Sequence, residues 1–467
     1  MVTIQETELI EKGVCAINRA KQLGRPILLS EVHQVEPTDP LFFFQIGKQN
    51  YFGERFFWKD PSDEIILAGI GIAKQIQSDD AFDRFFYVEK NWKDFLKESI
   101  ILNPFAENAV GPLMFGGFSF DPYKPKTGLW SKFADSLFHI PQYMLSIIKG
   151  KTYLTTNIVC TQHDDLELLQ KVTSERNQLL TSLKHRPATT SANLIKTEEI
   201  SPNEWKASVD EIVNDLTSGG SLKKVVLARE LRLYFDHTIE AESVLFRLLK
   251  EQQESFIFAF EANGDCFIGA SPERLVKKQE NDVFSTCLAG SISRGRTEAE
   301  DHALGEELLN DHKNLVEHQY VVEMIKEALE ESCEQVILPD KPQLMKMRDI
   351  QHLYTPVIGK SKKETSLLLF VERLHPTPAL GGLPKKEAVE KIRQVEELDR
   401  GFYAAPLGWM DYKGNGEFAV SIRSGLVQGN EASLFAGCGV VANSNSESEY
   451  LETGLKFRPM LRALGGK

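Results

Sequence analysis

Three carboxylates on two predicted helices have the type and spacing that suggest chemistry. Glu449 and Glu452 are three residues apart, so one face of the last predicted helix carries both side chains. Glu317 lies in the middle of an earlier predicted helix. Hard divalent cations such as Mg²⁺ bind carboxylate oxygens and usually take one or two of them from a protein. Acidic residues on helices are more often only solvated, and spacing alone favours that alternative.

A lysine and a glutamate could transfer protons. Lys224 begins the apolar segment KVVLAR, where burial can lower the pKa of an ammonium group and make the amine a base. Glu273, in GASPER, could act as a general acid if desolvation keeps its carboxyl protonated. The alternatives are an ordinary lysine before a strand and a glutamate that pairs with Arg274 or another cation. Neither residue is specific for catalysis by itself.

An arginine, two glycines and two histidines could contact a polar ligand. Arg423, in VSIRS, could grip a carboxylate with two hydrogen bonds, and Gly437 and Gly439, in AGCGV, let backbone N–H groups approach an anion. A surface arginine and glycines that relieve crowding between strands would produce the same sequence. His352 and His375 are further candidates. A lone histidine more often makes a structural hydrogen bond, and we keep that interpretation for His375.

The elements that must position these residues alternate between strands and helices after residue 200. Ser201 and Pro202 predict the start of a helix, with Ser201 as the first residue of a capping box, and Gly219-Gly220 predicts its end. Asn263-Gly264 suits the tight turn of a β-hairpin. The other predicted elements are strands over 224–235, 256–261, 266–270, 403–411, 417–427 and 432–441, and helices over 240–251, 297–333, 384–397 and 447–464.

The first part of the chain is predicted to be rich in sheet. Apolar and aromatic runs over 41–44, 65–72 and 111–120 predict strands, and helices are expected near 3–22 and 162–184. No cluster of residues there suggests chemistry.

A linker is predicted over 186–200, which is rich in Thr, Ser and Ala and lacks periodicity. We therefore divide the chain into an N-terminal sheet-rich region, residues 1–190, and a catalytic region, residues 201–467, on which the first region packs.

Composition and charge exclude several classes of protein. The chain has 467 residues, 42% hydrophobic and 26% charged, which excludes a disordered chain. Its net charge of −13 argues against general nucleic-acid binding, although a local arginine or metal can still attract an anion. The longest apolar run, residues 65–73, is too short to cross a membrane, and the acidic N-terminus has no signal core, so we expect a cytoplasmic protein. The six cysteines form no CxxC pair, so a zinc site is not expected.

Taken together and in order, the segments from Lys224 to Arg458 resemble the chorismate-binding enzymes. This family includes anthranilate synthase component I, aminodeoxychorismate synthase, salicylate synthase and isochorismate synthase. The N-terminal part, around GPLMFGGFSFD, is similar to the extra region of the menaquinone-pathway isochorismate synthases. The matching segments are KVVLARE, FIGASPERL, CLAGSISRG, LVEHQ, QHLYTP, HPTPALGG, DRGFYAAPLGW, EFAVSIRSG, LFAGCGVV and SEYLETGLK.

The resemblance implies an α/β fold of the anthranilate synthase component I type. Two stacked β-sheets would be flanked by helices, with the active site deep between the layers. It also implies an Mg²⁺ ion that is bound by the carboxylates of Glu317 and Glu452, with Glu449 as an accessory acid, and that carries the ring carboxylate of chorismate.

The resemblance assigns the remaining roles residue by residue. Lys224 would activate water for attack at ring C2, and Glu273 would protonate the departing C4 hydroxyl. These roles require a site that holds the lysine neutral and the glutamic acid protonated for part of the time. The implied substrate-binding residues are His352 near the C4 hydroxyl, Arg423, Tyr403 and the backbone of Gly437 at the enolpyruvyl carboxylate, and Gly290 and Ser291 in the ring pocket.

Two positions narrow the implied activity. Anthranilate synthases usually have glutamine where Lys224 stands, so the lysine favours water over ammonia as the nucleophile, and no glutamine amidotransferase subunit is expected. Ala379 stands where aminating members and salicylate synthases usually have threonine. We therefore expect an Mg²⁺-dependent isomerase, an isochorismate synthase, and the long N-terminal region favours the menaquinone branch. The alternatives are a salicylate synthase, a siderophore-branch isochorismate synthase and a non-catalytic chorismate-binding subunit.

Overall fold

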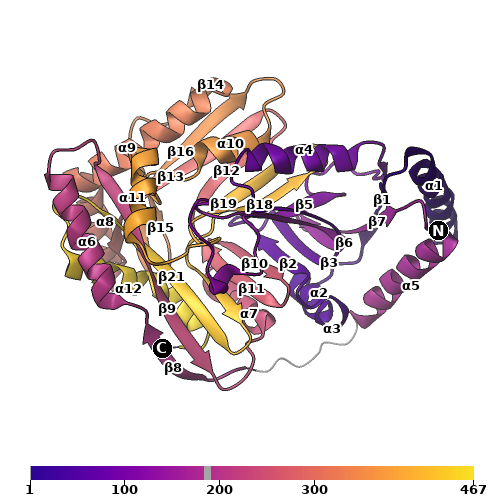
Figure 1. The fold of residues 1–467 in the computed structure, drawn as a ribbon, viewed down its shortest axis with the longest axis horizontal. Helices are drawn as coiled ribbons and strands as arrows, with labels where there is room; N and C mark the ends of the chain where they lie inside the picture. Colours follow the sequence, from indigo (N-terminus) through magenta and orange to yellow (C-terminus); the bar gives the residue numbers. More distant parts are fainter. Residues whose placement is uncertain (1, 184–190, 467) are drawn as a thin grey trace.

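The computed structural model describes residues 2–183 and 191–466 as a mixed α/β fold (Figure 1). The helices are α1 (Val2–Leu23), α2 (Pro40–Ile46), α3 (Lys48–Tyr51), α4 (Arg84–Leu96), the 3₁₀ turn η1 (Gly128–Trp130), α5 (Leu166–Ser182), α6 (Pro202–Thr217), α7 (Ala241–Glu251), α8 (Glu298–Asn310), α9 (His312–Glu330), α10 (Leu367–Leu374), α11 (Lys385–Val395) and α12 (Ser446–Ala463). The strands are β1 (Ile27–Val35), β2 (Arg55–Lys59), β3 (Ile65–Ser78), β4 (Ile100–Leu102), β5 (Leu113–Phe118), β6 (Ser136–Ile148), β7 (Lys151–Cys160), β8 (Leu194–Glu199), β9 (Lys224–Phe235), β10 (Phe256–Ala262), β11 (Asp265–Ser271), β12 (Arg274–Gln279), β13 (Asp282–Ser293), β14 (Cys333–Ile337), β15 (Gln343–Lys346), β16 (Ile350–Ser361), β17 (Gly382–Leu383), β18 (Pro406–Asp411), β19 (Gly416–Val420), β20 (Ser424–Gln428) and β21 (Glu431–Val440).

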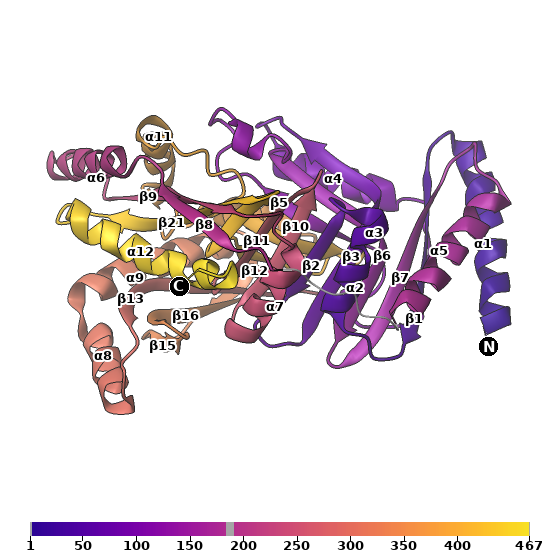
Figure 2. The same cartoon turned by 90° about the horizontal axis from the view of Figure 1, so that it is seen from below.

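Most strands form two layers. In the first layer the paired strands follow the order β8, β9, β21, β20, β11, β10, β2 and β3. In the second the order is β5, β18, β19, β12, β13 and β16. Strand β6 pairs with both β3 and β5, so the two predicted sheets occur as two layers of one 21-stranded hydrogen-bonded network. In Figure 2, β9 and β21 of the first layer lie above β13 and β16 of the second.

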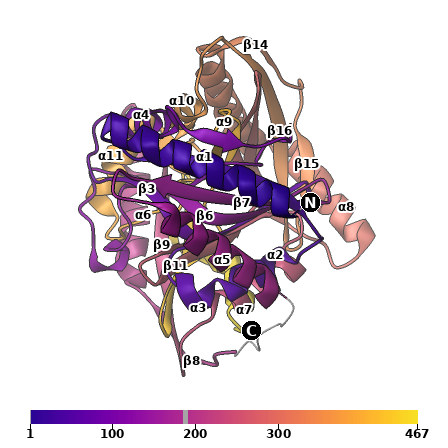
Figure 3. The same ribbon diagram turned by 90° about the vertical axis from the view of Figure 1, so that its right-hand side faces the viewer.

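Hydrophobic side chains pack both faces of the first layer, because successive residues of a strand point to opposite faces. Between the layers, the ring of Phe115 stacks on that of Phe56 with centroids 4.4 Å apart and lies 5.5 Å from that of Phe260. Ile257 and Ala259 of β10 join a second core, to which α1, α2, α5, α7 and α12 contribute. Two of these helices, α1 and α5, face the viewer in Figure 3. Among the described residues, no helix is long and apolar enough to span a membrane.

The chain crosses between the layers at Glu273, which links β11 to β12, and again at Arg423, which links β19 to β20. The two crossings lie side by side: the backbone N–H of Val420 donates to the carbonyl of Glu273 at 3.0 Å, and that of Ala270 donates to the carbonyl of Arg423 at 3.0 Å. The prediction of one continuous strand over 417–427 is therefore wrong. The backbone breaks at Arg423, where φ is +52°, in the left-handed region.

A helix cap explains one wrong strand prediction. Residues 41–44 lie in α2, because the carboxylate of Asp39 accepts hydrogen bonds from the N–H groups of Leu41 and Phe42, and Pro40 begins the helix. The start of α6 at Pro202 is confirmed, but no side-chain capping bond forms there.

Two further element boundaries differ from the predictions. The region 297–333 holds two helices, because Asp311 leaves helical geometry and its side chain accepts a 2.7 Å hydrogen bond from the N–H of Asn314, which caps α9. The strand predicted over 403–411 begins only at Pro406. The hairpin across Asn263-Gly264 is confirmed, with positive φ at both residues.

The predicted linker contains a strand. Within 186–200, β8 pairs with β9, and its mostly exposed side chains explain why no apolar alternation marked it. The part of the linker up to residue 190 lies outside the described residues. Strands from the two sides of this segment pair with each other, β2 with β10 and β5 with β18. The division of the chain into two regions stays a prediction.

Candidate active site

A cavity of about 280 Å³ opens beside the two crossings, with walls from both layers. Its walls include residues from β9, β13, α9, β16, β21 and α12 and from both crossings. The structure thus brings together every residue that the resemblance assigned to the site, while the role of each stays a prediction. The residues are Lys224, Glu273, Gly290, Ser291, Glu317, His352, Ala379, Tyr403, Arg423, Gly437, Glu449 and Glu452.

Lys224 is buried at the start of β9, and its Nζ donates a 2.6 Å hydrogen bond to Oε1 of Glu317 on α9. The neighbouring His318 anchors α9, because its ring nitrogens lie 3.0 Å from the carbonyl of Ala289 and 2.8 Å from Oγ1 of Thr355. Burial alone would raise the pKa of Glu317, but the charge and hydrogen bond of Lys224 outweigh it and lower that pKa. The lysine is therefore a buried group that faces the cavity.

Glu449 and Glu452 project from α12 toward the same cavity as Glu317. Oε1 of Glu452 accepts a 2.6 Å bond from Lys456, whose charge lowers the pKa of Glu452 against the opposing effect of burial. Burial raises the pKa of Glu449, and the charge of Glu452 adds to that effect. Glu452 also repels the carboxylate of Glu317, so the three acids are close enough to interact.

Such a set of mutually repelling oxygen donors fits a hard divalent cation. Across residues 2–183 and 191–466, no three His, Cys, Asp or Glu side chains are grouped so that they could hold a metal by themselves. A cation bound here would therefore need oxygen atoms from water or from a substrate as well.

Glu273 is buried, with only 4% of its surface exposed, and its carboxyl makes no hydrogen bond or ion pair with any described residue. The alternative partner, Arg274, instead pairs with Glu417 at 2.6 Å. Burial raises the pKa of Glu273 to about 8, although the charges of Arg423 and Lys224 oppose the shift. The group is therefore mostly protonated at neutral pH, as a general acid requires.

Arg423 lines the cavity from the second crossing. Its guanidinium makes no hydrogen bond or ion pair within the part of the chain that the structure describes, and burial lowers its pKa against the opposing effect of Tyr403 and Glu452. Tyr403 is buried beside it, and a Cβ atom added to Gly437 would lie 3.4 Å from the Tyr403 hydroxyl. A cation without a protein partner at a cavity wall is suited to bind an anionic ligand.

A β-bulge shapes the opposite wall. Gly290 has φ +81°, and the register of β13 against β16 shifts around it, so Ser291 pairs with His352. Oγ of Ser291 lies 2.7 Å from Nδ1 of His352. Burial, with the charges of Arg423 and Lys456, lowers the pKa of His352 to about 3. The imidazole is therefore neutral and can hydrogen-bond to an uncharged ligand group.

The other histidine, His375, does not line this cavity. Its Nε2 lies 3.0 Å from the carbonyl of Phe120, which agrees with the structural interpretation.

Lys456 and Arg400 are among the lining residues that escaped the sequence analysis. Lys456 lines the cavity and donates a 2.8 Å bond to the carbonyl of Gly437 as well as its bond to Glu452. Its spacing of four residues from Glu452 on a predicted helix was a signal that could have found it. Arg400 also lines the cavity; Glu396, four residues before it, was a local signal, but its other two partners, the carbonyls of Leu380 and Val226, are distant in the chain.

Comparisons with known proteins agree on one family. The family model described as "Chorismate binding enzyme" matches residues 15–465. Isochorismate synthase MenF from Bacillus subtilis (strain 168) is 42% identical over the full length of both chains. Salicylate biosynthesis isochorismate synthase from Pseudomonas aeruginosa is 36% identical over 97% of this chain and 94% of that protein. The solved structure of MenF, the menaquinone-specific isochorismate synthase from Escherichia coli, matches with a TM-score of 0.76 at 22% identity, over 97% of this chain and 99% of that one, which confirms the predicted fold.

Proposed function

The chain belongs to the chorismate-binding enzyme family, and we propose that it is the isochorismate synthase of a menaquinone pathway. It is an isomerase that converts chorismate reversibly to isochorismate. One observation carries the proposal: a buried lysine amine and a buried carboxyl with a pKa of about 8 line the same cavity. The identity of 42% with MenF over the full length of both chains supports the menaquinone branch.

The reaction exchanges one hydroxyl position for another. A water oxygen bonds to ring C2, the two ring double bonds each shift by one position, and the C4–O bond breaks. Lys224 in its neutral form takes a proton from the attacking water, and Glu273 gives its proton to the departing hydroxyl, which leaves as water. One water enters and one leaves, so the product is an isomer of the substrate. Because water is the nucleophile, activity needs no amidotransferase subunit.

Charge neutralisation holds the substrate, which carries two carboxylates while the protein has a net charge of −13. Glu317 and Glu452, with Glu449 as an accessory acid, would hold Mg²⁺. When bound, Mg²⁺ neutralises the ring carboxylate of chorismate. Arg423, Tyr403 and the backbone of Gly437 take the enolpyruvyl carboxylate. The remaining cavity residues that we assign to the substrate are His352, Gly290, Ser291 and Ala379.

A product assay tests this function. The purified protein is incubated with chorismate and Mg²⁺, and the products are separated by chromatography and identified by mass. We expect a persisting mixture of chorismate and isochorismate. Accumulation of pyruvate with salicylate would instead identify a salicylate synthase, and chorismate binding without turnover would identify a non-catalytic subunit.

A further inference from the structure

We propose that Arg400 is a positioning residue that aligns one wall of the active site, and that the N-terminal region acts on this wall through Phe120. This inference rests on the proposed function, because its readout is the turnover of chorismate. Arg400 lies between α11 and β18 and is 3% exposed.

The need for such a residue arises at an edge of β9. One edge of this strand pairs with β21 from Val225 to Tyr234. On the other edge, β17 pairs only with Lys224 and Val225, and β8 pairs only from Leu231 onward. Among the described strands none covers the backbone between these two partners. Buried backbone groups there need other hydrogen-bond partners.

The side chains of Arg400 and Glu396 fill this gap. Nη2 of Arg400 donates to the carbonyl of Val226 at 2.7 Å, and Oε2 of Glu396 accepts from the N–H of Ala228 at 2.8 Å. The two side chains bind each other with contacts of 2.6 and 2.7 Å, and Nη1 of Arg400 donates to the carbonyl of Leu380 at 3.1 Å. The carbonyl of Gly381 also accepts from the N–H of Val226 at 2.9 Å, and with it the buried ion pair takes the place of a neighbouring strand.

These hydrogen bonds reach three segments of the site. One bonded carbonyl lies two residues after Lys224, and the other directly follows Ala379. The N–H of Tyr403 donates to the carbonyl of Arg400 at 2.8 Å. A shift of the guanidinium would therefore displace the proposed base and the pocket wall together, while the backbone of Arg400 holds the segment of Tyr403.

Phe120, from the N-terminal region, packs against this guanidinium. Cζ of Arg400 lies 4.2 Å from the centroid of the Phe120 ring, within the range of a cation–π contact. The backbone N–H of Phe120 also donates to the carbonyl of Gly401 at 2.7 Å. The ring covers one face of the guanidinium and limits its movement.

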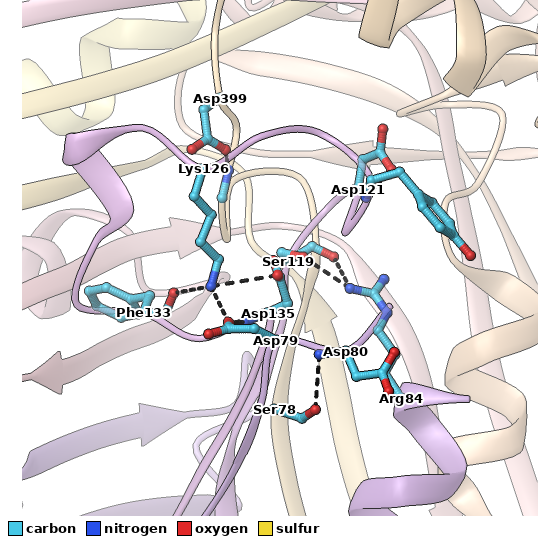
Figure 4. A network of polar contacts seen from close by, with 12 residues as sticks. Ser78, Asp79, Asp80, Arg84, Ser119, Asp121, Lys126, Phe133, Asp135 and Asp399 are labelled. Atoms are coloured by element: carbon cyan, nitrogen blue, oxygen red, sulfur yellow. Dashed lines mark hydrogen bonds and ion pairs between the residues drawn. The ribbon is translucent and has the colours of Figure 1, made fainter. Parts of the chain in front are cut away.

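The segment 119–135, which carries Phe120, is itself held firmly (Figure 4). Nη1 of Arg84 donates to the carbonyl and to Oγ of Ser119, at 2.9 and 3.0 Å. The N–H of Thr127 donates to Oδ2 of Asp399 at 2.8 Å, one residue before Arg400. The N-terminal region is therefore connected to the positioning residue by backbone contacts and by a buried ring.

A second arginine at the same contact supplies a matched control. Arg393 binds Asp121 through two contacts of 2.7 and 2.9 Å, so it joins the same two segments. Within the part of the chain that the structure describes, its side chain makes no hydrogen bond or ion pair with β9 or Leu380, and 29% of that side chain is exposed. Loss of this pair should weaken the contact between segments without moving the site.

The experiment compares Phe120→Leu, Arg400→Lys and Arg393→Gln in the full chain, with kcat and KM for chorismate measured per folded molecule. We expect kcat to fall about 100-fold in Arg400→Lys and about tenfold in Phe120→Leu, because small misplacements of reacting groups are costly. Arg393→Gln should stay within about twofold of wild type. Melting temperatures check that each variant is folded.

The double variant Phe120→Leu, Arg400→Lys separates positioning from general stability. If Phe120 acts through Arg400, the loss of kcat in the double variant should match the loss in Arg400→Lys alone, because the effects of the two substitutions are then not additive. Fully additive losses of kcat in the double variant would overturn the inference, as would an unchanged kcat in both folded single variants. In either case the proposed function stands as long as the unmodified protein converts chorismate. A wild-type protein that does not convert chorismate would overturn both.

Discussion

The amine of Lys224 and the carboxylate of Glu317, 93 residues apart in the sequence, are joined by a hydrogen bond of 2.6 Å. The contact links the start of β9, in the first layer, to α9, which packs on β13 of the second. It therefore holds the proposed base and a proposed cation ligand at one place on the cavity wall. The buried acid Glu273 lines the same cavity.

Replacing Lys224 by alanine should abolish water addition. Loss of a proton-transfer group typically lowers the rate by about 10²–10⁴-fold, while the groups that bind the substrate carboxylates stay in place. Chromatography of the products measures the rate, and equilibrium binding of chorismate checks that the site is intact. The exposed neighbour Lys223 is the control, and Lys223→Ala should keep wild-type turnover. Unchanged turnover in Lys224→Ala would remove this residue from the role of base.

The dependence of kcat/KM on pH should report the ionisation of the Glu273 carboxyl. Its carboxyl must be protonated to act as an acid, and its pKa is raised to about 8 by burial. The acid form is therefore present below that pH, and kcat/KM for chorismate should fall as pH rises through about 8. In Glu273→Gln the activity should be low at every pH and this basic limb should disappear. A basic limb that persists in the variant would assign the titration to another group.

Arg423 should contribute mainly to substrate binding. Its guanidinium has no hydrogen bond or ion pair with the residues that the structure describes, so a ligand carboxylate would be its first partner. Arg423→Met should raise KM for chorismate about 10- to 100-fold, the effect of losing a charge-assisted hydrogen bond. The exposed Arg458 on α12 is the control. Equal KM values in wild type and Arg423→Met would contradict the assignment.

Glu452 should set the requirement for Mg²⁺. Glu452→Gln removes one charged oxygen donor, so more Mg²⁺ should be needed for half-maximal activity. Glu447→Gln is the control on the same helix, because Glu447 is exposed and pairs with Lys206. A titration that coincides with that of wild type would show that Glu452 is not a metal ligand.

Ala379 should influence which product forms. Ala379→Thr adds a hydroxyl to the cavity wall and should change the ratio of isochorismate to pyruvate and salicylate. Ala379→Val has a similar volume without the hydroxyl, so it separates the effect of size from that of hydrogen bonding. An unchanged product ratio in Ala379→Thr would show that this position does not discriminate between the two reactions.

Local patterns predicted much of this protein. Hydrophobic periodicity, capping residues and the Asn263-Gly264 turn are properties of short segments. They located most helices of the catalytic region and the strands β9 to β11 and β18 to β21, but not β12 to β17. The order of the motifs identified the family and the residues that line the cavity. The strand prediction for Leu41–Phe44 was wrong, because a short apolar run fits a helix or a strand and the cap at Asp39 decided between them.

Partners and protonation could be known only from the folded chain. The sequence suggested Arg274 as a partner for Glu273. In the structure the chain crosses between the layers at Glu273, so this glutamate is buried and Arg274 forms an ion pair with Glu417 instead. The sequence showed nothing of the link from Phe120 to Arg400, whose residues lie 280 positions apart. Hydrogen-bond partners, desolvation and the pKa shifts that follow depend on segments distant in the chain, and only tertiary packing brings those segments together.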